Sequence, residues 1–274
     1  MINGLSFDIE DWFQVENFRS VCPYEKWESC ELRVEKNTEL LLELLEKFNH
    51  KATFFILGWV AERKPDLVRK IAAQGHEIAS HGYRHEIVYG LTEDSFRKDL
   101  LLSKKILENI AGKEVIGYRA PNFSITKDSL WAIDILKELN FKYDSSIFPT
   151  SFHNRYGFDG IKDSNFFKFQ NGIQEFPLTI YKLGKLNFPL AGGGYFRLIP
   201  YGVVKKMLKG INRRSKEFIF YLHPWELDKD QPRLKVKKQF SFRHYVNLSK
   251  TEAKLRCLLG DFKFQPLKEF LKHE

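Results

Sequence analysis

Short apolar runs alternate along the first half of the chain with longer segments in which apolar residues recur every three or four positions. The short runs predict β-strands at residues 2–7, 51–57, 76–80, 115–118 and 141–143. The periodic segments between them predict helices at residues 40–48, 67–74, 92–111 and 127–139. Strands that alternate with helices pair in parallel through right-handed crossovers, so the pattern predicts an α/β fold.

Several predicted helices carry residues that favour a helix end. Asn37 or Thr38 is a plausible N-cap for the first helix. Thr92 opens the long third helix, and Gly112 follows its last residue, where a left-handed glycine commonly ends a helix.

The second half of the chain is less regular. Strands are predicted at residues 174–177, 217–222 and 262–264, with helices at 201–210, 249–259 and 267–271. Ser249 and Glu252 have the spacing of a capping box. No change in composition separates the halves, so we expect one domain over residues 1–274, made of a motif-bearing barrel at about 2–225 and a C-terminal extension at about 226–274.

Composition excludes several classes of protein. Hydrophobic residues make up 43% and charged residues 29%, which is typical of a globular protein rather than a disordered or fibrous one. The longest nearly apolar run, residues 52–61, has about half of the ~20 residues that a membrane helix needs. Acidic residues occupy positions 8, 10 and 11, where a signal peptide would be apolar, and the three cysteines are scattered. We therefore expect a reduced, cytoplasmic protein.

The net charge of +9 permits nucleic acid, anionic lipid or an anionic substrate as a partner without choosing among them. Two basic stretches stand out, at residues 205–216 and 233–238. Solvated surface is the simpler interpretation of both. The functional alternative is an electrostatic dock for an anionic membrane or a lipid-linked glycan, which would make the protein peripheral to the inner membrane.

Polar residues with reactive side chains recur directly after the predicted strands. They are Asp8, Glu10, Asp11, His81, His85, Arg119, Asn122, Asp144, Ser145 and His223. In α/β barrels the carboxyl ends of the strands share one face, and active sites are built there. We therefore expect these distant residues to converge.

The spacing of two histidines indicates a divalent metal site. His81 and His85 lie four positions apart, so both imidazoles can reach one ion. Asp8, Glu10 and Asp11 crowd three acidic groups at one strand end, and a bound cation would relieve their repulsion. A metal ion held by two histidines and one carboxylate keeps coordination positions open for water and substrate, which is typical of a catalytic site.

These motifs, in this order, resemble the polysaccharide deacetylase family, carbohydrate esterase family four, which includes chitooligosaccharide deacetylases. The resemblance covers roughly residues 2–223 and rests on the motifs Ser6-Phe7-Asp8, Ser80-His81-xxx-His85, Arg119-x-Pro121, Tyr143-Asp144-Ser145 and Leu222-His223. The opening around Asp8, the segments 192–197 and 223–228, and the tail Arg243-His244-Tyr245 look like the deacetylases of exosortase-associated exopolysaccharide clusters.

The resemblance implies a distorted (β/α) barrel that hydrolyses the N-acetyl group of amino sugars with a divalent metal, commonly zinc. Carried over by position, Asp8 is the general base, oriented by Arg119. His81, His85 and a downstream acid hold the metal, and the backbone N–H of Asn122 contributes to the oxyanion hole. His223 protonates the leaving amine, and Asp144 tunes this histidine.

The first motif departs from the family pattern, which has two adjacent aspartates where this chain has Ile9 after Asp8. Residues two apart on a strand face the same side, so Glu10 is the preferred ligand, with Asp11 close behind. Gly192–Gly194 is expected to be a tight turn. The candidates for substrate contact are Arg33, Tyr118, Arg197 and Trp225.

The leading hypothesis is a metal-dependent hydrolase that removes N-acetyl groups from amino sugars of a surface or exopolysaccharide, or of its lipid-linked precursor, and releases acetate. Three alternatives stay open: an amidohydrolase acting on a cyclic imide or ureide, as allantoinase does; a mononuclear iron oxygenase with the same ligand count; and a basic nucleic-acid-binding module. No nucleic-acid-binding signature is present, so nucleic acid is not the expected partner.

Overall fold

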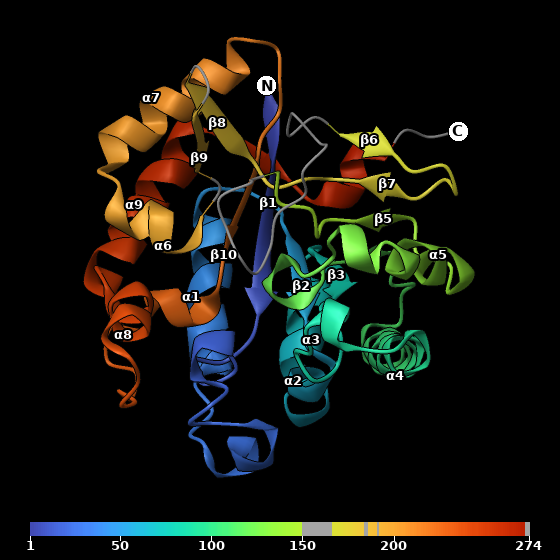
Figure 1. Cartoon of the computed structure of the whole chain (residues 1–274). Helices are drawn as coiled ribbons and strands as arrows, with labels where there is room; N and C mark the ends of the chain where they lie inside the picture. Colours follow the sequence, from blue (N-terminus) through green and yellow to red (C-terminus); the bar gives the residue numbers. More distant parts are fainter. Residues whose placement is uncertain (150–165, 184–185, 191, 272–274) are drawn as a thin grey trace.

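The computed structural model describes residues 1–149, 166–183, 186–190 and 192–271. A curled, mostly parallel sheet forms the centre of the fold, with strands in the order β10-β1-β2-β3-β4-β5-β7-β6 and with β11 also paired to β1 (Figure 1). The β6–β7 pair is antiparallel, and β8 with β9 forms a separate antiparallel hairpin. The expected α/β barrel is therefore an open half-barrel in the described part of the chain.

The eleven strands that the described residues form are short apart from the first. Their bounds are β1 Ile2–Ile9, β2 Thr53–Ile56, β3 Glu77–Ser80, β4 Gly117–Tyr118, β5 Tyr143–Asp144, β6 Phe167–Lys168, β7 Gln174–Glu175, β8 Ile180–Leu183, β9 Leu186–Pro189, β10 Ile219–Leu222 and β11 Lys263–Gln265. The helix bounds are α1 Val34–Lys47, α2 Gly58–Arg63, α3 Pro65–Ala73, α4 Glu93–Ala111, α5 Trp131–Glu138, α6 Gly193–Leu198, α7 Tyr201–Asn212, α8 Lys238–Tyr245 and α9 Leu248–Asp261. No described helix is long and apolar enough to cross a membrane.

Strand alternation divides the core into two clusters of buried side chains, one on each face of the sheet. On β2, Phe54 belongs to one cluster and Phe55 to the other, and Ile78 and Ala79 of β3 divide in the same way. Since successive side chains of a strand point to opposite faces, this division is expected for a sheet buried on both sides. Phe7 belongs to the first cluster, so Asp8 next to it points to the concave face.

The register of the parallel strands aligns their carboxyl ends. Leu222 pairs with Phe7, Ile56 with Ser80, and Ser80 in turn with Tyr118. The residues that follow these strands therefore emerge along one rim of the sheet, as the sequence predicted.

The two ends of α4 are as predicted. Thr92 is its N-cap, its side chain accepting a bond from the backbone N–H of Ser95, and Gly112 ends the helix with φ 63°. Three other predictions are wrong in detail. Asn37 and Thr38 lie inside α1, Ser249 lies inside α9, and the predicted helix at 127–139 divides into a 3₁₀ turn and α5.

Candidate active site

A cavity of about 420 Å³ opens at the carboxyl rim of the sheet. Its lining includes eight of the predicted residues, namely Asp8, Glu10, His81, His85, Asn122, Arg197, His223 and Trp225. Segments from α6 and α8 close another side of the same cavity. The convergence expected from the strand ends therefore occurs.

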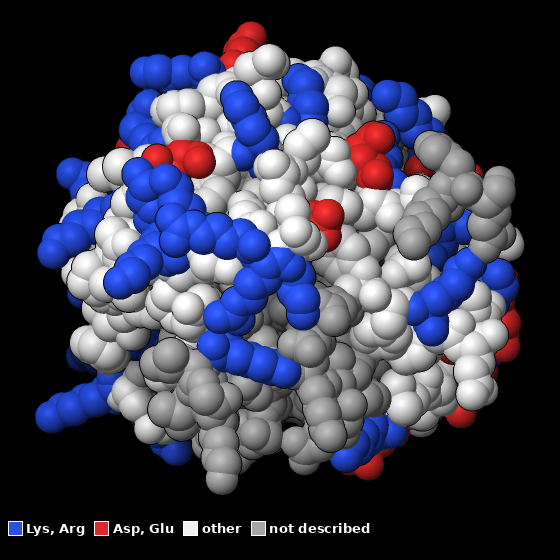
Figure 2. All heavy atoms as spheres, turned by 90° about the horizontal axis from the view of Figure 1, so that it is seen from above, with Lys and Arg blue, Asp and Glu red and all other residues white. Residues whose placement is uncertain are grey.

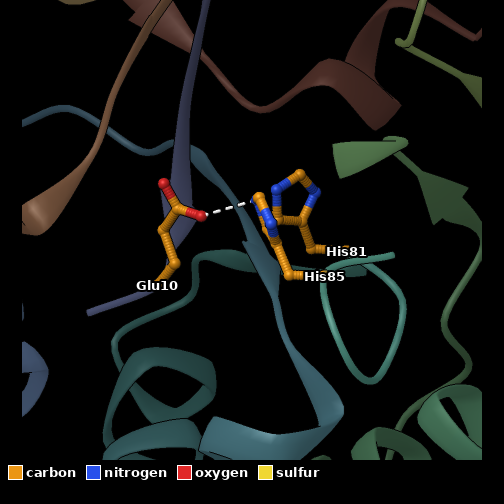
Figure 3. Close-up of side chains that lie close together, drawn as sticks. All are labelled: Glu10, His81 and His85. Carbon is orange, nitrogen blue, oxygen red and sulfur yellow. Dashed lines mark ion pairs between the residues drawn. The ribbon is translucent and has the colours of Figure 1, made fainter. Parts of the chain in front are cut away.

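Glu10, His81 and His85 form the candidate metal centre (Figure 3). One ligand atom from each lies within 4.8 Å of the others, and all three side chains are buried. His85 Nε2 is 2.7 Å from Glu10 Oε2, yet that oxygen has no hydrogen-bond partner of acceptable geometry among the described residues. A buried carboxylate oxygen facing an imidazole nitrogen without a directed hydrogen bond suits two ligands of one cation.

The loop after β3 positions the two histidines. His85 adopts φ 55°, in the left-handed region that side chains rarely occupy, and the two ring centroids are 5.5 Å apart. His81 Nδ1 donates to the backbone carbonyl of Arg119 at 2.8 Å, because a carbonyl can only accept. The lone pair of His81 Nε2 is then available to a metal.

The electrostatic surroundings of Glu10 and His81 favour the protonation states in which these residues bind a metal. Burial lowers the pKa of His81 to about 4, so its imidazole is neutral near pH 7. Burial alone would raise the pKa of Glu10, but the neighbouring His85 and His223 outweigh burial and lower that pKa to about 2. A neutral imidazole and an ionised carboxylate are the protonation states that metal ligands require.

Arg119 fixes the carboxylate of Asp8. The fully buried guanidinium donates from Nη1 to Asp8 Oδ1 at 2.7 Å and to Ser6 Oγ at 2.8 Å. Its remaining donors bind the carbonyl and hydroxyl of Ser145 at 3.0 and 2.8 Å. Because all three nitrogens of the guanidinium donate hydrogen bonds, Arg119 is fixed in place and holds Asp8 Oδ1. The other oxygen, Oδ2, then faces the cavity and His223.

His223 faces the same two carboxylates from β10. Its Nε2 lies 3.9 Å from Asp8 Oδ2 and 3.3 Å from Glu10 Oε1, and Trp225 Nε1 also donates to Glu10 Oε1. Burial lowers the pKa of His223, but Glu10, Glu226 and Asp8 together raise it to about 9. The imidazole is thus placed to carry a proton into the cavity.

Asn122 also lines the cavity. It sits in a turn at φ 52°, and its side-chain Nδ2 is buried without a partner among the described residues. The turn therefore places Asn122, with its side-chain amide donor, in the wall of the cavity.

Asp11 and Asp144 lie outside the centre. Asp11 accepts from the backbone N–H groups of Arg33 and Val34 at 2.7 and 2.9 Å, so it caps the start of α1 instead of joining the metal group. Asp144 accepts from Ser146, and the carboxylate that contacts His223 Nδ1 is that of Glu226 at 2.8 Å. The carboxylate beside His223 is therefore that of Glu226 and not that of Asp144, to which the resemblance gave the tuning role.

Two predicted substrate residues do not line the cavity. Arg33 forms an ion pair with Asp228, whose Oδ2 is 2.6 Å from Nε, and Tyr118 is a core residue that packs edge-on against Phe96 and Phe141. Arg197 does line it, although its guanidinium donates to Glu226 and to backbone carbonyls.

Sequence reasoning overlooked two residues that support the site. Ser145 was noted as a strand-end residue but not as the anchor of Arg119, a contact that depends on the relative placement of β4 and β5. Glu226 lies within the segment 223–228 that carries part of the resemblance, which assigns it no role. Its i,i+3 spacing from His223, with the backbone N–H of His223 donating to Glu226 Oε1 at 3.1 Å, is the signal that could have found it.

Two family models match successive parts of the chain. Residues 26–143 match the Polysaccharide deacetylase family, and the chain carries a polysaccharide deacetylase domain. Residues 145–272 match a second family, described as a domain of unknown function (DUF3473). Strand β1, which carries Asp8 and is followed by Glu10, lies outside both matched segments. It pairs with strands from each, namely β2 from the first and β10 from the second.

Individual relatives agree with this assignment. The chain is 37% identical over 98 residues to a peptidoglycan-N-acetylglucosamine deacetylase of Bacillus cereus, a match that covers 35% of this chain and 36% of that protein. The chain spans little more than a third of the length of such curated relatives.

Solved structures share the fold over nearly the whole chain. A Mycobacterium smegmatis protein assigned as a polysaccharide deacetylase has a TM-score of 0.64 at 20% identity, covering 97% of this chain and 87% of that one. An allantoinase has a TM-score of 0.59 at 14% identity, covering 96% and 85%. The fold is therefore that of the deacetylases, and it is shared by an enzyme with a different substrate.

Proposed function

We propose that the protein is a metal-dependent hydrolase that removes N-acetyl groups from amino sugars in a glycan and releases acetate. The observation that carries the proposal is the cavity in which an anchored carboxylate, a two-histidine and carboxylate group and a further histidine face one another. The relatives named as deacetylases support the same chemistry.

The metal would be held by Glu10, His81 and His85, and we propose zinc, which this mixture of nitrogen and oxygen ligands suits. A bound divalent ion would polarise the acetamide carbonyl and lower the pKa of water in the site.

The chain's own residues would then divide the proton transfers. Asp8, whose Oδ2 faces the cavity while Arg119 holds Oδ1, would take a proton from the attacking water. His223 Nε2 would donate a proton to the leaving amine, and the N–H of Asn122 would stabilise the oxyanion. Acetate and the free amino sugar leave.

The rim of the cavity suits a substrate larger than one sugar. Tyr195 is 38% exposed and Phe242 58% exposed, and both lie on the lining beyond the catalytic cluster. Aromatic faces pack against the apolar faces of sugar rings. We therefore propose a surface polysaccharide or exopolysaccharide, or its lipid-linked precursor, as the substrate, and a cytoplasmic site of action.

The alternatives have less support. An allantoinase shares the fold, but the relatives that match by sequence include several named as deacetylases. An iron oxygenase would leave the Asp8–Arg119 pair and His223 without a role.

Two measurements on the purified protein test the proposal, namely metal content and acetate release from N-acetylglucosamine oligomers. We expect about one metal ion per chain, release that stops after chelation and returns on adding zinc, and loss of release in Asp8→Asn with metal retained. Metal without acetate release would refute the substrate, and acetate release unaffected by chelation would refute the metal's role.

A further inference from the structure

Two buried side chains that the proposed mechanism does not use connect His223 to the C-terminal extension. Glu226, at the start of the extension, contacts His223 directly, and Arg197 holds Glu226. Glu226 is fully buried, and its Oε1 accepts from both the ring Nδ1 and the backbone N–H of His223, at 2.8 and 3.1 Å. Its Oε2 accepts from Nε of Arg197 at 2.7 Å, so both oxygens of the carboxylate are occupied.

Arg197 connects this carboxylate to α8. Beyond Glu226, the guanidinium donates from Nη1 to the carbonyls of His244 and Val246 at 2.6 and 3.0 Å, and from Nη2 to the carbonyl of Arg243 at 2.9 Å. These carbonyls belong to the last turn of α8 and the residue after it, where a helix favours a cation. Arg197 is 2% exposed, so this is a built connection rather than a surface ion pair.

A stack of rings runs alongside the same connection. The ring of Trp225 lies between His223, at 5.1 Å and 23°, and His244 of α8, at 4.2 Å and 12°. The extension thus supports the imidazole of His223 on its face as well as at Nδ1.

We infer that Glu226, anchored by Arg197 to α8, is the positioning residue of His223, and that the C-terminal extension is therefore a working part of the active site. An ionised carboxylate can only accept, so His223 Nδ1 must carry a hydrogen and Nε2 is directed at Asp8 and Glu10. Loss of Glu226 would free the ring to rotate or to exchange tautomers, which would slow proton donation without weakening substrate binding.

The inference rests on the proposed function, and steady-state kinetics on N-acetylglucosamine oligomers test it. Glu226→Gln should lower kcat at least tenfold, with KM within twofold and metal content unchanged. Glu252→Gln is the matched control, because that carboxylate pairs with Arg256 on the surface of α9, away from the cavity. It should leave kcat and KM unchanged.

A double-mutant comparison separates positioning from general damage to the fold. If Glu226 acts through the imidazole, Glu226→Gln should cost nothing further in a His223→Ala background. The same tenfold loss in both backgrounds, or wild-type kcat in Glu226→Gln, would overturn the inference while leaving the proposed function intact. Glu226→Asp, which keeps the charge but shortens the reach, replaces Glu226→Gln if the latter does not fold, and should show the same fall in kcat and the same non-additivity. A wild-type protein without acetate release would overturn both proposals.

Discussion

At the scale of single residues, the opening segment gives adjacent carboxylates different tasks. Asp8 and Glu10 face the cavity, whereas Asp11 faces the start of α1. Burial raises the pKa of Asp11 to about 6 although the backbone N–H groups of Arg33, Val34 and Trp12 donate to it, whereas neighbouring histidines keep Glu10 ionised. The surroundings of Glu10 and Asp11 thus give two neighbouring carboxyl groups opposite pKa shifts and different roles.

This difference predicts separate effects for two substitutions. Glu10→Gln should abolish metal binding with little change in stability, because the amide keeps the shape but loses the ligand charge. Asp11→Ala should keep the metal and lower the free energy of unfolding by about 0.5–2 kcal/mol, the usual range for a lost helix cap. Metal analysis after dialysis and chemical denaturation measure the two effects. Metal loss in Asp11→Ala with full occupancy in Glu10→Gln would reverse the ligand assignment.

At the scale of elements, local signals were predictable and long-range ones were not. The caps of α4 involve residues within a few positions of each helix end, so the sequence displays them. The start of α1 is set by Asp11, 22 residues before Arg33 on the chain, and the N-cap expected at Asn37 or Thr38 was wrong for that reason.

The same contrast holds within the site. Strand ends in register bring Asp8, His81 and His223 together, which the alternation of strands and helices already predicted. The i,i+3 spacing of His223 and Glu226 is a local signal for their contact. The position of Asp144 away from His223 depends on how β5 and β10 lie relative to one another, which no local spacing reports.

A buried histidine at the start of β3 predicts acid sensitivity of the sheet. His76 Nδ1 accepts from the backbone N–H of Ala52 at 3.3 Å, and burial, with a smaller effect of Lys51, lowers the pKa of His76 to about 4. The neutral form is therefore favoured on folding. Its contribution to stability is full above about pH 6.5 and is lost as the pH falls toward 4, at up to about 1.4 kcal/mol per pH unit.

Replacing this group should flatten the pH dependence of stability. His76→Asn keeps an acceptor but cannot titrate, so its free energy of unfolding should fall less than that of the wild type between pH 6.5 and 4.5. Urea denaturation at a series of pH values measures the two slopes. If the free energy of unfolding falls equally with pH in the wild type and in His76→Asn, His76 is not the source of the acid sensitivity.

At the scale of the whole molecule, the two basic stretches lie at different ends. Figure 2 views the end from which β1 starts, opposite the catalytic rim, and shows Lys and Arg crowded on the side where α7 lies. The exposed basic residues of that stretch are Lys206, Lys209, Arg213, Arg214 and Lys216. The second stretch leads into α8, whose Gln239, Phe242 and Arg243 line the cavity.

Only the second stretch is placed to bring the cavity to a membrane. If the substrate is lipid-linked, charge reversal at Arg233, Lys235 and Lys237 should slow deacetylation of an N-acetylglucosamine oligomer anchored in anionic vesicles at low salt, at about 1 kcal/mol per charge, or roughly fivefold each. The rate on the same oligomer in solution should not change.

The matched control reverses Lys206 and Lys209 on α7 together with Arg213, which directly follows it. Because α7 lies toward the end of the molecule opposite the catalytic rim, a bilayer attracted to that end would leave the cavity pointing into the solvent, and the reversal should not slow the reaction on vesicles. Equal losses in the two variants would indicate a general effect of net charge rather than a dock beside the cavity. No loss in either would identify both stretches as solvated surface and would favour a soluble glycan as the substrate.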